Sequence, residues 1–467
     1  MRDTVEMLKG ERGARVLLAV VAQSSLGTGA AYVALLLVAY DRFDSAWAIS
    51  LVLLAEFVPA MLLGPLCGAA ADRWPRRRCV VIADLIRAGA FVGVAVAGSF
   101  GLTVAFAVLA GAGTALFRPS MLAALPGLVR PERLPAATSA YGAVTDVGFT
   151  LGPAIAAPLL VVASPENVLI ANGATFLISA AVLGRLQFGQ APAANEAYPA
   201  ESLLGQAREG LRAVSGMRAV AVLIALTGGS MLSGGIFNVI ELPFATDELG
   251  IGGSGYAALV AVYGLGFLGG SLAGAGGGAA PLLKRRFLQG LVLTGLGGVI
   301  AAVAPGLVIG TLAFAIGGFG NGFFITHQRL LIQADVPERL QGRTFGLLDT
   351  CTSWGLAIAF ISGGALTAIA ATRELMLATG VWELALAFAA VIALRSHWRR
   401  DDRGATVVVR GAEAALGSES RSNPALKAHL GQQQPHVIGG PALWLGLLDD
   451  LHESRHDARV ELGAGVG

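Results

Sequence analysis

The stretch GPLCGAAADRWPRRR, from Gly64 to Arg78, separates two long apolar runs and fits the pattern Gly-x-x-x-Asp-Arg-x-x-Arg-Arg. Glycines one helical turn apart permit close contact between helix backbones. An acid at a helix end can bond an Arg or face the positive N-terminus of a neighbouring helix. The stretch predicts either a charged lock that breaks in one conformation or a plain basic anchor at an anionic membrane surface. The residues assigned to the lock are Gly64, Gly68, Asp72, Arg73, Arg76 and Arg77.

The composition of the chain indicates a membrane protein. Of its 467 residues, 55% are hydrophobic and only 14% are charged, against roughly 25% charged residues in a typical soluble domain. The mean hydropathy is +0.68. These values exclude a soluble enzyme, a disordered protein and a disulfide scaffold. The three cysteines lack metal-ligand spacing, so we expect no metal site. We also expect no cofactor and no nucleic-acid partner.

Apolar runs separated by short polar or Gly/Pro breaks predict an all-α membrane protein with twelve transmembrane helices. A spanning helix needs about 20 apolar residues, whereas the strands of a β-barrel would alternate in polarity. The expected spans are residues 16–40, 46–71, 79–98, 101–124, 138–163, 166–186, 219–245, 255–280, 287–304, 307–331, 344–370 and 374–395.

Basic residues gather in every second loop, beginning with the N-terminal residues. The loops of the other side carry only Arg42 and Arg373. Because Lys and Arg are retained in cytoplasmic loops, we expect both termini to be cytoplasmic. Nearly all of the basic residues are Arg, a bias typical of GC-rich bacterial genomes, so the expected location is a bacterial plasma (inner) membrane.

The two halves of the chain share a short sequence motif. Pro131–Leu134 and Pro337–Leu340 both read PERL and occupy the equivalent loop of each half, as a duplicated six-helix unit requires. The expected segments are a cytoplasmic leader at 1–15, a six-helix bundle at 16–186, a cytoplasmic linker at 187–217, a second six-helix bundle at 218–395 and a disordered cytoplasmic tail at 396–467.

At these residues the chain resembles the major facilitator superfamily, whose signature loop has the pattern of Gly64–Arg78 at the same place. The exporter branch that includes enterobactin and macrolide exporters is similar at Phe117–Ser120, Leu125–Leu134, Gly152–Pro153 and Gln333–Arg343. The resemblance covers about residues 15–395. It implies two pseudo-symmetric bundles that rock to open a central cavity to each side in turn.

The resemblance also implies roles for single residues. Asp72 is expected to bond near the start of span 11, around Arg343–Gly346, with Asp349 in the same inner gate. The residues expected to bend span 5, as in drug antiporters, are Gly148, Gly152 and Pro153. Two departures stand out: the loop at 276–287 has no acid matching Asp72, and Thr28 follows Ser24–Gly27 where relatives often carry an acid.

Ionisable residues inside spans cost about 2.5–3.5 kcal/mol each on insertion scales, so they are functional candidates. The candidates for proton coupling are Glu56, Glu241, Asp84 and Asp146, and the candidates for ion pairs are Arg87 and Arg118. Each has a structural alternative. Glu56 could be a protonated packing residue, Asp84 and Arg87 are spaced to form a local ion pair, and Arg118 and Asp146 could form a structural or gating pair.

The leading hypothesis is a secondary transporter that exports a lipophilic small molecule in exchange for protons. The candidate cavity residues are Gln23, Ser24, Ser230, Asn238 and Gln328. The stretch Gly264–Gly269 matches a dinucleotide fingerprint, but its position inside a span favours helix packing instead. The alternative is a non-transporting protein, either a lipid-handling factor or a sensor that binds partners through its tail. Deleting residues 404–467 discriminates between the two hypotheses.

Overall fold

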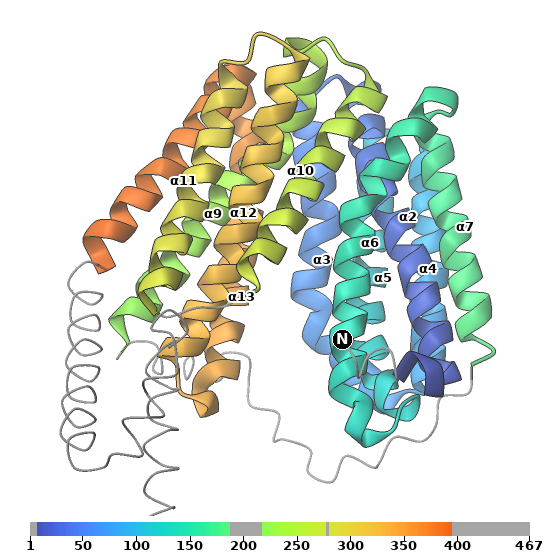
Figure 1. The fold of residues 1–467 in the computed structure, drawn as a ribbon. Coiled ribbons are helices and arrows are strands. Elements are labelled where there is room, and N and C mark those ends of the chain that lie inside the picture. Colours follow the sequence, from blue (N-terminus) through green and yellow to red (C-terminus); the bar gives the residue numbers. More distant parts are fainter. Residues whose placement is uncertain (1–6, 187–216, 277–279, 395–467) are drawn as a thin grey trace, which may run out of the picture. The chain divides into compact units, whose positions relative to one another are not determined.

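The computed structural model describes residues 7–186, 217–276 and 280–394, and these residues form helices joined by turns (Figure 1). The first half contains α2 (Arg12–Phe43), α3 (Ala46–Arg73), α4 (Arg76–Val96), α5 (Phe100–Ala124), α6 (Leu134–Val162) and α7 (Pro165–Leu183). Two short 3-10 helices, η1 (Leu125–Gly127) and η2 (Pro131–Arg133), connect α5 to α6. The predicted linker at 187–217, except Met217, and the predicted tail at 396–467 lie outside the described residues.

The second half contains α9 (Arg218–Pro243), α10 (Gly253–Gly274), α11 (Ala280–Ala302), α12 (Leu307–Asp335), α13 (Glu338–Thr367) and a last helix, Thr372–Leu394. A π-helical segment, η3 (Phe244–Glu248), follows α9. Eleven of the described helices are long and apolar enough to cross a membrane. The remaining long helix, α11, carries three consecutive basic residues near its start. The predicted fold class is confirmed, and each predicted span has its helix.

Local sequence signals place the turn between α2 and α3. α2 ends at Phe43 because Asp44 adopts a left-handed conformation and its N–H bonds the carbonyl of Tyr40. Ser45 then accepts a hydrogen bond from the backbone N–H of Trp47 and caps the start of α3. A polar cap satisfies a backbone donor that the helix itself leaves free. The turn is therefore short, and α2 and α3 are antiparallel neighbours.

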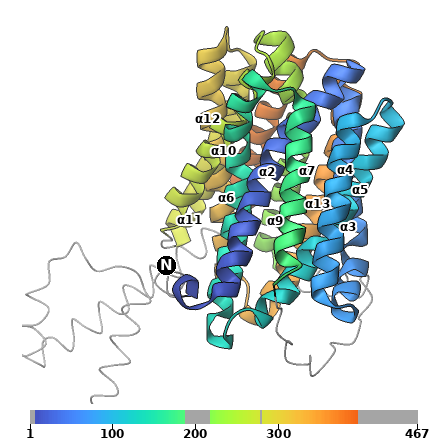
Figure 2. The same cartoon turned by 90° about the vertical axis from the view of Figure 1, so that its right-hand side faces the viewer.

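Helix packing repeats in the two halves. Within the first bundle α3 packs on α5 and α2 on α6, and within the second bundle α10 packs on α12 and α9 on α13. Figure 2 shows α6, α2, α7 and α4 side by side. Between the bundles, α6 packs on α10 and α13 packs on α3. α6 in the first half is equivalent to α13 in the second, and α3 is equivalent to α10. The two contacts are therefore equivalent, as an approximate two-fold axis between the halves requires.

Glycines allow the closest of these helix contacts. A Cβ on Gly152 of α6 would lie closer than 3.0 Å to the backbone of Gly29 on α2, and a Cβ on Gly148 would meet Ser25 as closely. In the second bundle, Gly266 of α10 lies equally close to the backbone of α12. The fingerprint-like glycines therefore serve helix packing, as predicted. The span-5 glycines hold α6 against α2.

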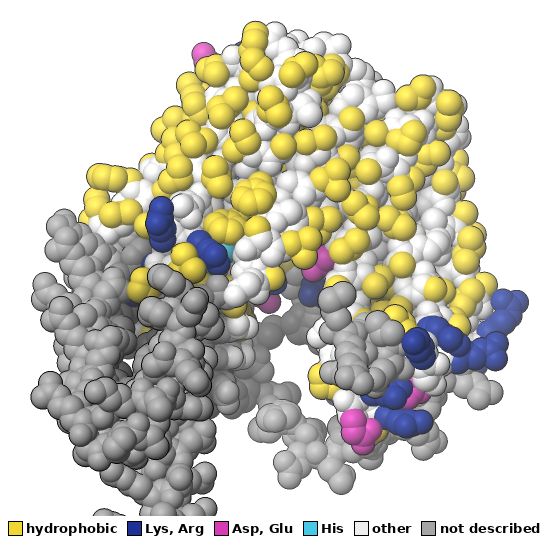
Figure 3. All heavy atoms as spheres, viewed as in Figure 1, with side chains coloured by type: hydrophobic (Ala, Val, Ile, Leu, Met, Phe, Trp, Pro, Cys, Tyr) yellow, Lys and Arg dark blue, Asp and Glu magenta, His cyan; other side chains and the backbone are white. Residues whose placement is uncertain are grey.

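The two ends of the bundles differ in charge. We call the basic end the one with the start of α2, the α3–α4 turn and the α5–α6 turn. The opposite, or far, end has the α2–α3 turn and η3. Figure 3 shows hydrophobic side chains over the middle of the visible face and Lys and Arg near its lower edge. An apolar middle with a basic rim is typical of a protein that crosses a membrane.

Candidate transport site

The bundles contact each other toward the far end. The rings of Phe57 in α3 and Phe360 in α13 meet edge to face, with centroids 6.1 Å apart. Gly364 of α13 packs against Ser50 of α3. Between α2 and η3, the hydroxyl of Tyr40 donates to Asp247 Oδ2 at 2.6 Å. Together these contacts close the far end.

The basic end of the same helix pair is open. No atom of another part of the described chain lies within 4 Å of the Cβ positions of Gly64 and Gly68 in α3. Gly342 and Gly346 in α13 are equally free of such neighbours within the described ranges. The helices that touch at Phe57 and Phe360 therefore separate toward the basic end.

Glu241 lies deep in this arrangement, in the far half of α9. Its side chain is buried, and the hydroxyl of Tyr256 in α10 donates to its Oε1 at 2.7 Å. A buried carboxylate is stable only when it is hydrogen-bonded, paired or neutralised. Among the described residues its donor is this uncharged hydroxyl, so Glu241 stays a candidate for proton coupling.

Glu56 approaches the same region from α3. It is half-buried, and its backbone packs against Gly111 of α5. Tyr32 of α2 lies within electrostatic range of both Glu56 and Glu241. The ring of Tyr32 also contacts Phe149 of α6, with centroids 5.8 Å apart. Two of the predicted proton-coupling candidates, one from each bundle, thus gather around one tyrosine.

Another carboxyl, Glu383 in the last helix, is buried and was not among the residues singled out from the sequence. The hydroxyl of Ser230 in α9 donates to its Oε1 at 2.8 Å. Tyr263 of α10 lies within electrostatic range of both Glu383 and Glu241, and its hydroxyl accepts a hydrogen bond from Asn321 at 2.7 Å. The signal was present, because Glu383 interrupts an apolar run in the same way as Glu56.

The polar cavity candidates fall into two groups. Gln23 and Asn238 are half-buried, and the buried Oε1 of Gln23 has no hydrogen-bond partner in the described part of the chain. Ser24 and Gln328 are buried, and Ser24 donates to the carbonyl of Val21. The hydroxyl of Ser230 is already hydrogen-bonded to Glu383. Gln23 and Asn238 are therefore better placed than the other three for a cargo.

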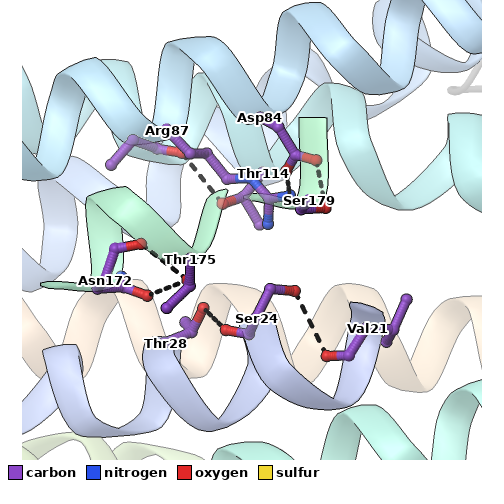
Figure 4. A network of polar contacts seen from close by, with 10 residues as sticks. Val21, Ser24, Thr28, Asp84, Arg87, Thr114, Asn172, Thr175 and Ser179 are labelled. Atoms are coloured by element: carbon purple, nitrogen blue, oxygen red, sulfur yellow. Dashed lines mark hydrogen bonds and ion pairs between the residues drawn. The ribbon is translucent and has the colours of Figure 1, made fainter. Parts of the chain in front are cut away.

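Asp84 and Arg87 form an ion pair inside the first bundle (Figure 4). Ser179 of α7 donates to Asp84 Oδ2 at 2.6 Å. The Arg87 guanidinium lies between the rings of Phe117 and Phe176, at 3.8 and 4.2 Å from their centroids. Such stacking suits a desolvated guanidinium. The arrangement favours a structural role, which ties α4 to α5 and α7.

Arg118 and Asp146 are both exposed, and no ion pair joins them. Asp146 lies one turn from Thr150, which packs against Gly264 of α10. Asp146 is thus on the face of α6 that meets the second bundle, toward the basic end. It remains a candidate for gating or for contact with a cargo that enters there.

The residues of the signature stretch lie on the open side. Arg73 and Arg77 are exposed and Arg76 is half-buried. Across from them, Arg343 and Asp349 of α13 are also exposed. The side chain of Asp72 lies outside what the structure describes, so its bond to α13 stays a prediction.

A family model connects this geometry to known proteins. The model of the Major Facilitator Superfamily matches residues 17–360. The chain belongs to the Major Facilitator Superfamily. It is therefore a multi-pass membrane transporter and not an enzyme.

Relatives of this transporter include efflux proteins. It is 26% identical over 409 residues to the multidrug efflux pump Tap of Mycolicibacterium fortuitum. The aligned residues cover 83% of this chain and 98% of that protein. It is 25% identical to the uncharacterized MFS-type transporter YfiS of Bacillus subtilis, covering 77% and 88% of the two chains. Over 131 residues it is 29% identical to macrolide efflux protein A of Streptococcus pyogenes, covering 26% and 31%.

Solved structures share the fold. The nucleoside transporter NupG has a TM-score of 0.65 at 14% identity and covers 82% of this chain and 99% of its own. A bacterial homolog of the human lysosomal transporter Spinster, in an inward-facing and unoccupied conformation, has a TM-score of 0.64 at 17% identity, with coverage of 83% and 98%. At these identities the likeness concerns the fold alone.

Proposed function

We propose that this transporter exports a lipophilic small molecule from a bacterial cell in exchange for protons. The observation that carries the proposal is the group of carboxyls, Glu56, Glu241 and Glu383, deep in a protein that is closed at the far end and open at the basic end. Its likeness to efflux pumps supports export as the direction.

The distribution of charge supports an orientation. Basic residues are retained on the cytoplasmic side of bacterial inner membranes. We therefore place the basic end and both termini in the cytoplasm. The described conformation then faces inward, and a drug, a siderophore or a secondary metabolite enters from the cytoplasm between α3 and α13.

The chemistry around the carboxyls supports a lipophilic cargo with a basic group. Aromatic rings surround the region, including Tyr32, Phe237, Tyr263 and Phe314. Aromatic faces and a carboxylate together attract an organic cation. Arg87, a basic residue buried in the first bundle, is already bonded to Asp84 and does not compete for the carboxyls. Gln23 and Asn238 offer polar contacts.

The proposed cycle follows from these placements. A basic cargo binds from the cytoplasm and favours loss of the proton from Glu241 or Glu56. The glycine faces of α3 and α13 then approach, the far end opens and the cargo leaves. A proton from outside neutralises the carboxyl, and the far-end contacts form again. Because the proton enters from outside, export is expected to speed up as the outside is acidified and to slow as it is made alkaline.

Transport in proteoliposomes with an imposed pH gradient tests the proposal. A panel of lipophilic amines and antibiotics is offered to the wild type, to Glu241→Gln and to Glu56→Gln. We expect the wild type to drive flux with the gradient, and at least one of the two variants to keep cargo exchange but lose the response to pH. Tyr256→Phe, which removes only the hydroxyl bonded to Glu241, is expected to shift the pH response without abolishing flux.

Other outcomes of the panel have defined meanings. Wild-type flux that ignores the pH gradient contradicts proton coupling and leaves a facilitator or another ion. Loss of all activity on deletion of residues 404–467 favours the sensor or lipid-handling alternative, because an exporter is expected to work without its tail.

A further inference from the structure

We infer that Glu383 is a second proton-binding group of this transporter, separate from the cargo-facing carboxyls and coupled to them through α9. The inference rests on the proposed function and adds a site to it. It starts from the position of Glu383, which bonds Ser230 of the same bundle, whereas Glu56 and Glu241 come from different bundles and both lie within electrostatic range of Tyr32.

The two oxygens of Glu383 differ in their partners. Oε1 accepts a hydrogen bond from Ser230, and the residue is only 3% exposed. Oε2 is buried and has no partner among the described residues. No ion pair to Glu383 occurs within the described ranges. A carboxyl with one neutral donor and one free oxygen is well suited to carry a proton on the free oxygen.

The elements packed around Glu383 contribute hydroxyls and glycines rather than charges. α9 supplies Ser230 and Ser233, and α10 supplies the phenol of Tyr263. From α11, Gly295 packs against Gly380, one turn before Glu383, and against the neighbouring Leu384. Among the described residues, Tyr263 is a titratable group within electrostatic range of both Glu383 and Glu241. A change in the charge of Glu383 can therefore affect Glu241 through Tyr263.

Ser233 provides a physical switch. Its hydroxyl donates to the carbonyl of Thr379 over a long 3.4 Å, and it also lies within reach of the Glu383 carboxyl. When Glu383 releases its proton to water, both of its oxygens become acceptors, and Ser233 can leave Thr379 for Oε2. When a proton returns, one oxygen becomes a donor and Ser233 stays with Thr379.

This switch acts on the position of α9. Trp382, next to Glu383, already ties the last helix to α9 by donating from Nε1 to the carbonyl of Gly229 at 2.8 Å. Tightening of Ser230 and Ser233 onto an ionised Glu383 draws the same part of α9 toward the last helix. Glu241 lies farther along α9, so the movement changes its contact with Tyr256. Protonation of Glu383 and binding at Glu241 are therefore linked.

Infrared titration of the purified full chain in lipid nanodiscs tests whether Glu383 binds a proton. We expect a protonated-carboxyl band that is lost in Glu383→Gln, is moved in Ser230→Ala, and is restored in Ser230→Thr, which keeps the hydroxyl. Glu374→Gln is the matched control, because Glu374 lies in the same helix but is exposed. Identical titrations of the wild type and Glu383→Gln would overturn the inference.

Transport separates coupling from folding. One proton moving down one pH unit sustains about a tenfold ratio of cargo. We expect Glu383→Gln to lower the steady-state cargo ratio about tenfold per pH unit while cargo-for-cargo exchange continues. An unchanged ratio contradicts the coupling role. If the wild type itself ignores the pH gradient, the proposed function fails, and the infrared titration still decides whether Glu383 binds a proton.

Discussion

At the scale of residues, the two arginines at the far end explain an exception in the charge pattern. Arg42, at the end of α2, donates to the carbonyls of Val94, Ala95 and Ala97 at the C-terminal end of α4 and pairs with Glu166 at 3.1 Å. The second bundle repeats this arrangement with the partners exchanged. Arg373, at the start of the last helix, donates to Ala302 and Ala304 and pairs with Glu248 at 2.7 Å. Both arginines cap a helix C-terminus.

Arg42→Met is therefore expected to destabilise the folded transporter. Hydrogen bonds to charged groups contribute about 1.5–3 kcal/mol each, discounted here because the side chain is partly exposed. Arg42→Lys is expected to recover only part of the loss, since an ammonium lacks the planar fork of the guanidinium. Thermal denaturation in nanodiscs measures the change. Arg185→Met serves as the control because Arg185 is exposed and, among the described residues, its side chain bonds the carbonyl of Ala181, one turn earlier. Equal losses in both variants would contradict the capping role.

The sequence identified some residues of the candidate site and missed others. Glu56, Glu241, Asp84 and Arg87 stood out because a charge is rare in an apolar run. Their partners did not, since Tyr32, Tyr256 and Ser179 are ordinary residues of a span until the fold brings them to a carboxyl. A charged residue within an apolar run can be recognised from the sequence of one helix. Its partner on another helix can be identified only when the packing of the helices is known.

At the scale of elements, the apolar runs predicted the helices well. α2 extends beyond the expected 16–40 at both ends, from Arg12 to Phe43, because polar residues continue a helix that leaves the membrane. Hydropathy shows where a segment can cross the membrane, and caps such as Ser45 decide where a helix begins. Which helices pack together could be predicted from the sequence only in part, from glycines at helical spacing.

Gly152→Leu is expected to separate α6 from α2 and to destabilise the first bundle. Overpacking a close helix contact costs typically about 1–3 kcal/mol, and here the obstacle is the backbone of Gly29. Gly142→Leu makes the same change on the same helix, where no described atom lies within 4 Å of the Cβ position. Melting temperatures of the two variants provide the comparison. A Gly142→Leu variant as unstable as Gly152→Leu would point to helix propensity rather than packing.

At the scale of the whole molecule, the far end is closed by a few specific contacts. Tyr40 bonds Asp247, whose other oxygen accepts from Thr246 at 2.7 Å. Asp247 lies in the π-helical segment after Pro243, and such segments often occur at functional sites. This hydrogen bond must break for the far end to open.

Tyr40→Phe is therefore expected to raise the population open at the far end. Loss of one hydrogen bond to a charged group, about 1.5–3 kcal/mol, corresponds to a shift of about tenfold or more in the ratio of the two conformations. Distances between spin labels at the far ends of α3 and α13 measure that ratio. Asp247→Asn, which keeps an acceptor oxygen, is expected to shift it less. An unchanged distance distribution in Tyr40→Phe would show that Tyr40 does not hold the end closed.

Gly68→Leu is expected to act at the other end. A bulky side chain on the open glycine face of α3 prevents its approach to α13, so transport is expected to fall while folding is kept. Gly89→Leu in α4 adds the same side chain at an exposed position with no described atom within 4 Å of its Cβ position. Flux and expression level are measured together for both variants. Equal flux in the two would mean that closure does not use this face.

The number of carboxyls has an electrical consequence. If a cargo with one positive charge leaves as one proton enters, no net charge crosses the membrane and voltage does not affect the exchange. If Glu241 and Glu383 each bring a proton, one net charge enters per cycle. A membrane potential of about 100 mV, negative inside, then adds about 2.3 kcal/mol to each turnover. A cell could in that case continue to export a basic compound when the pH on the two sides is equal.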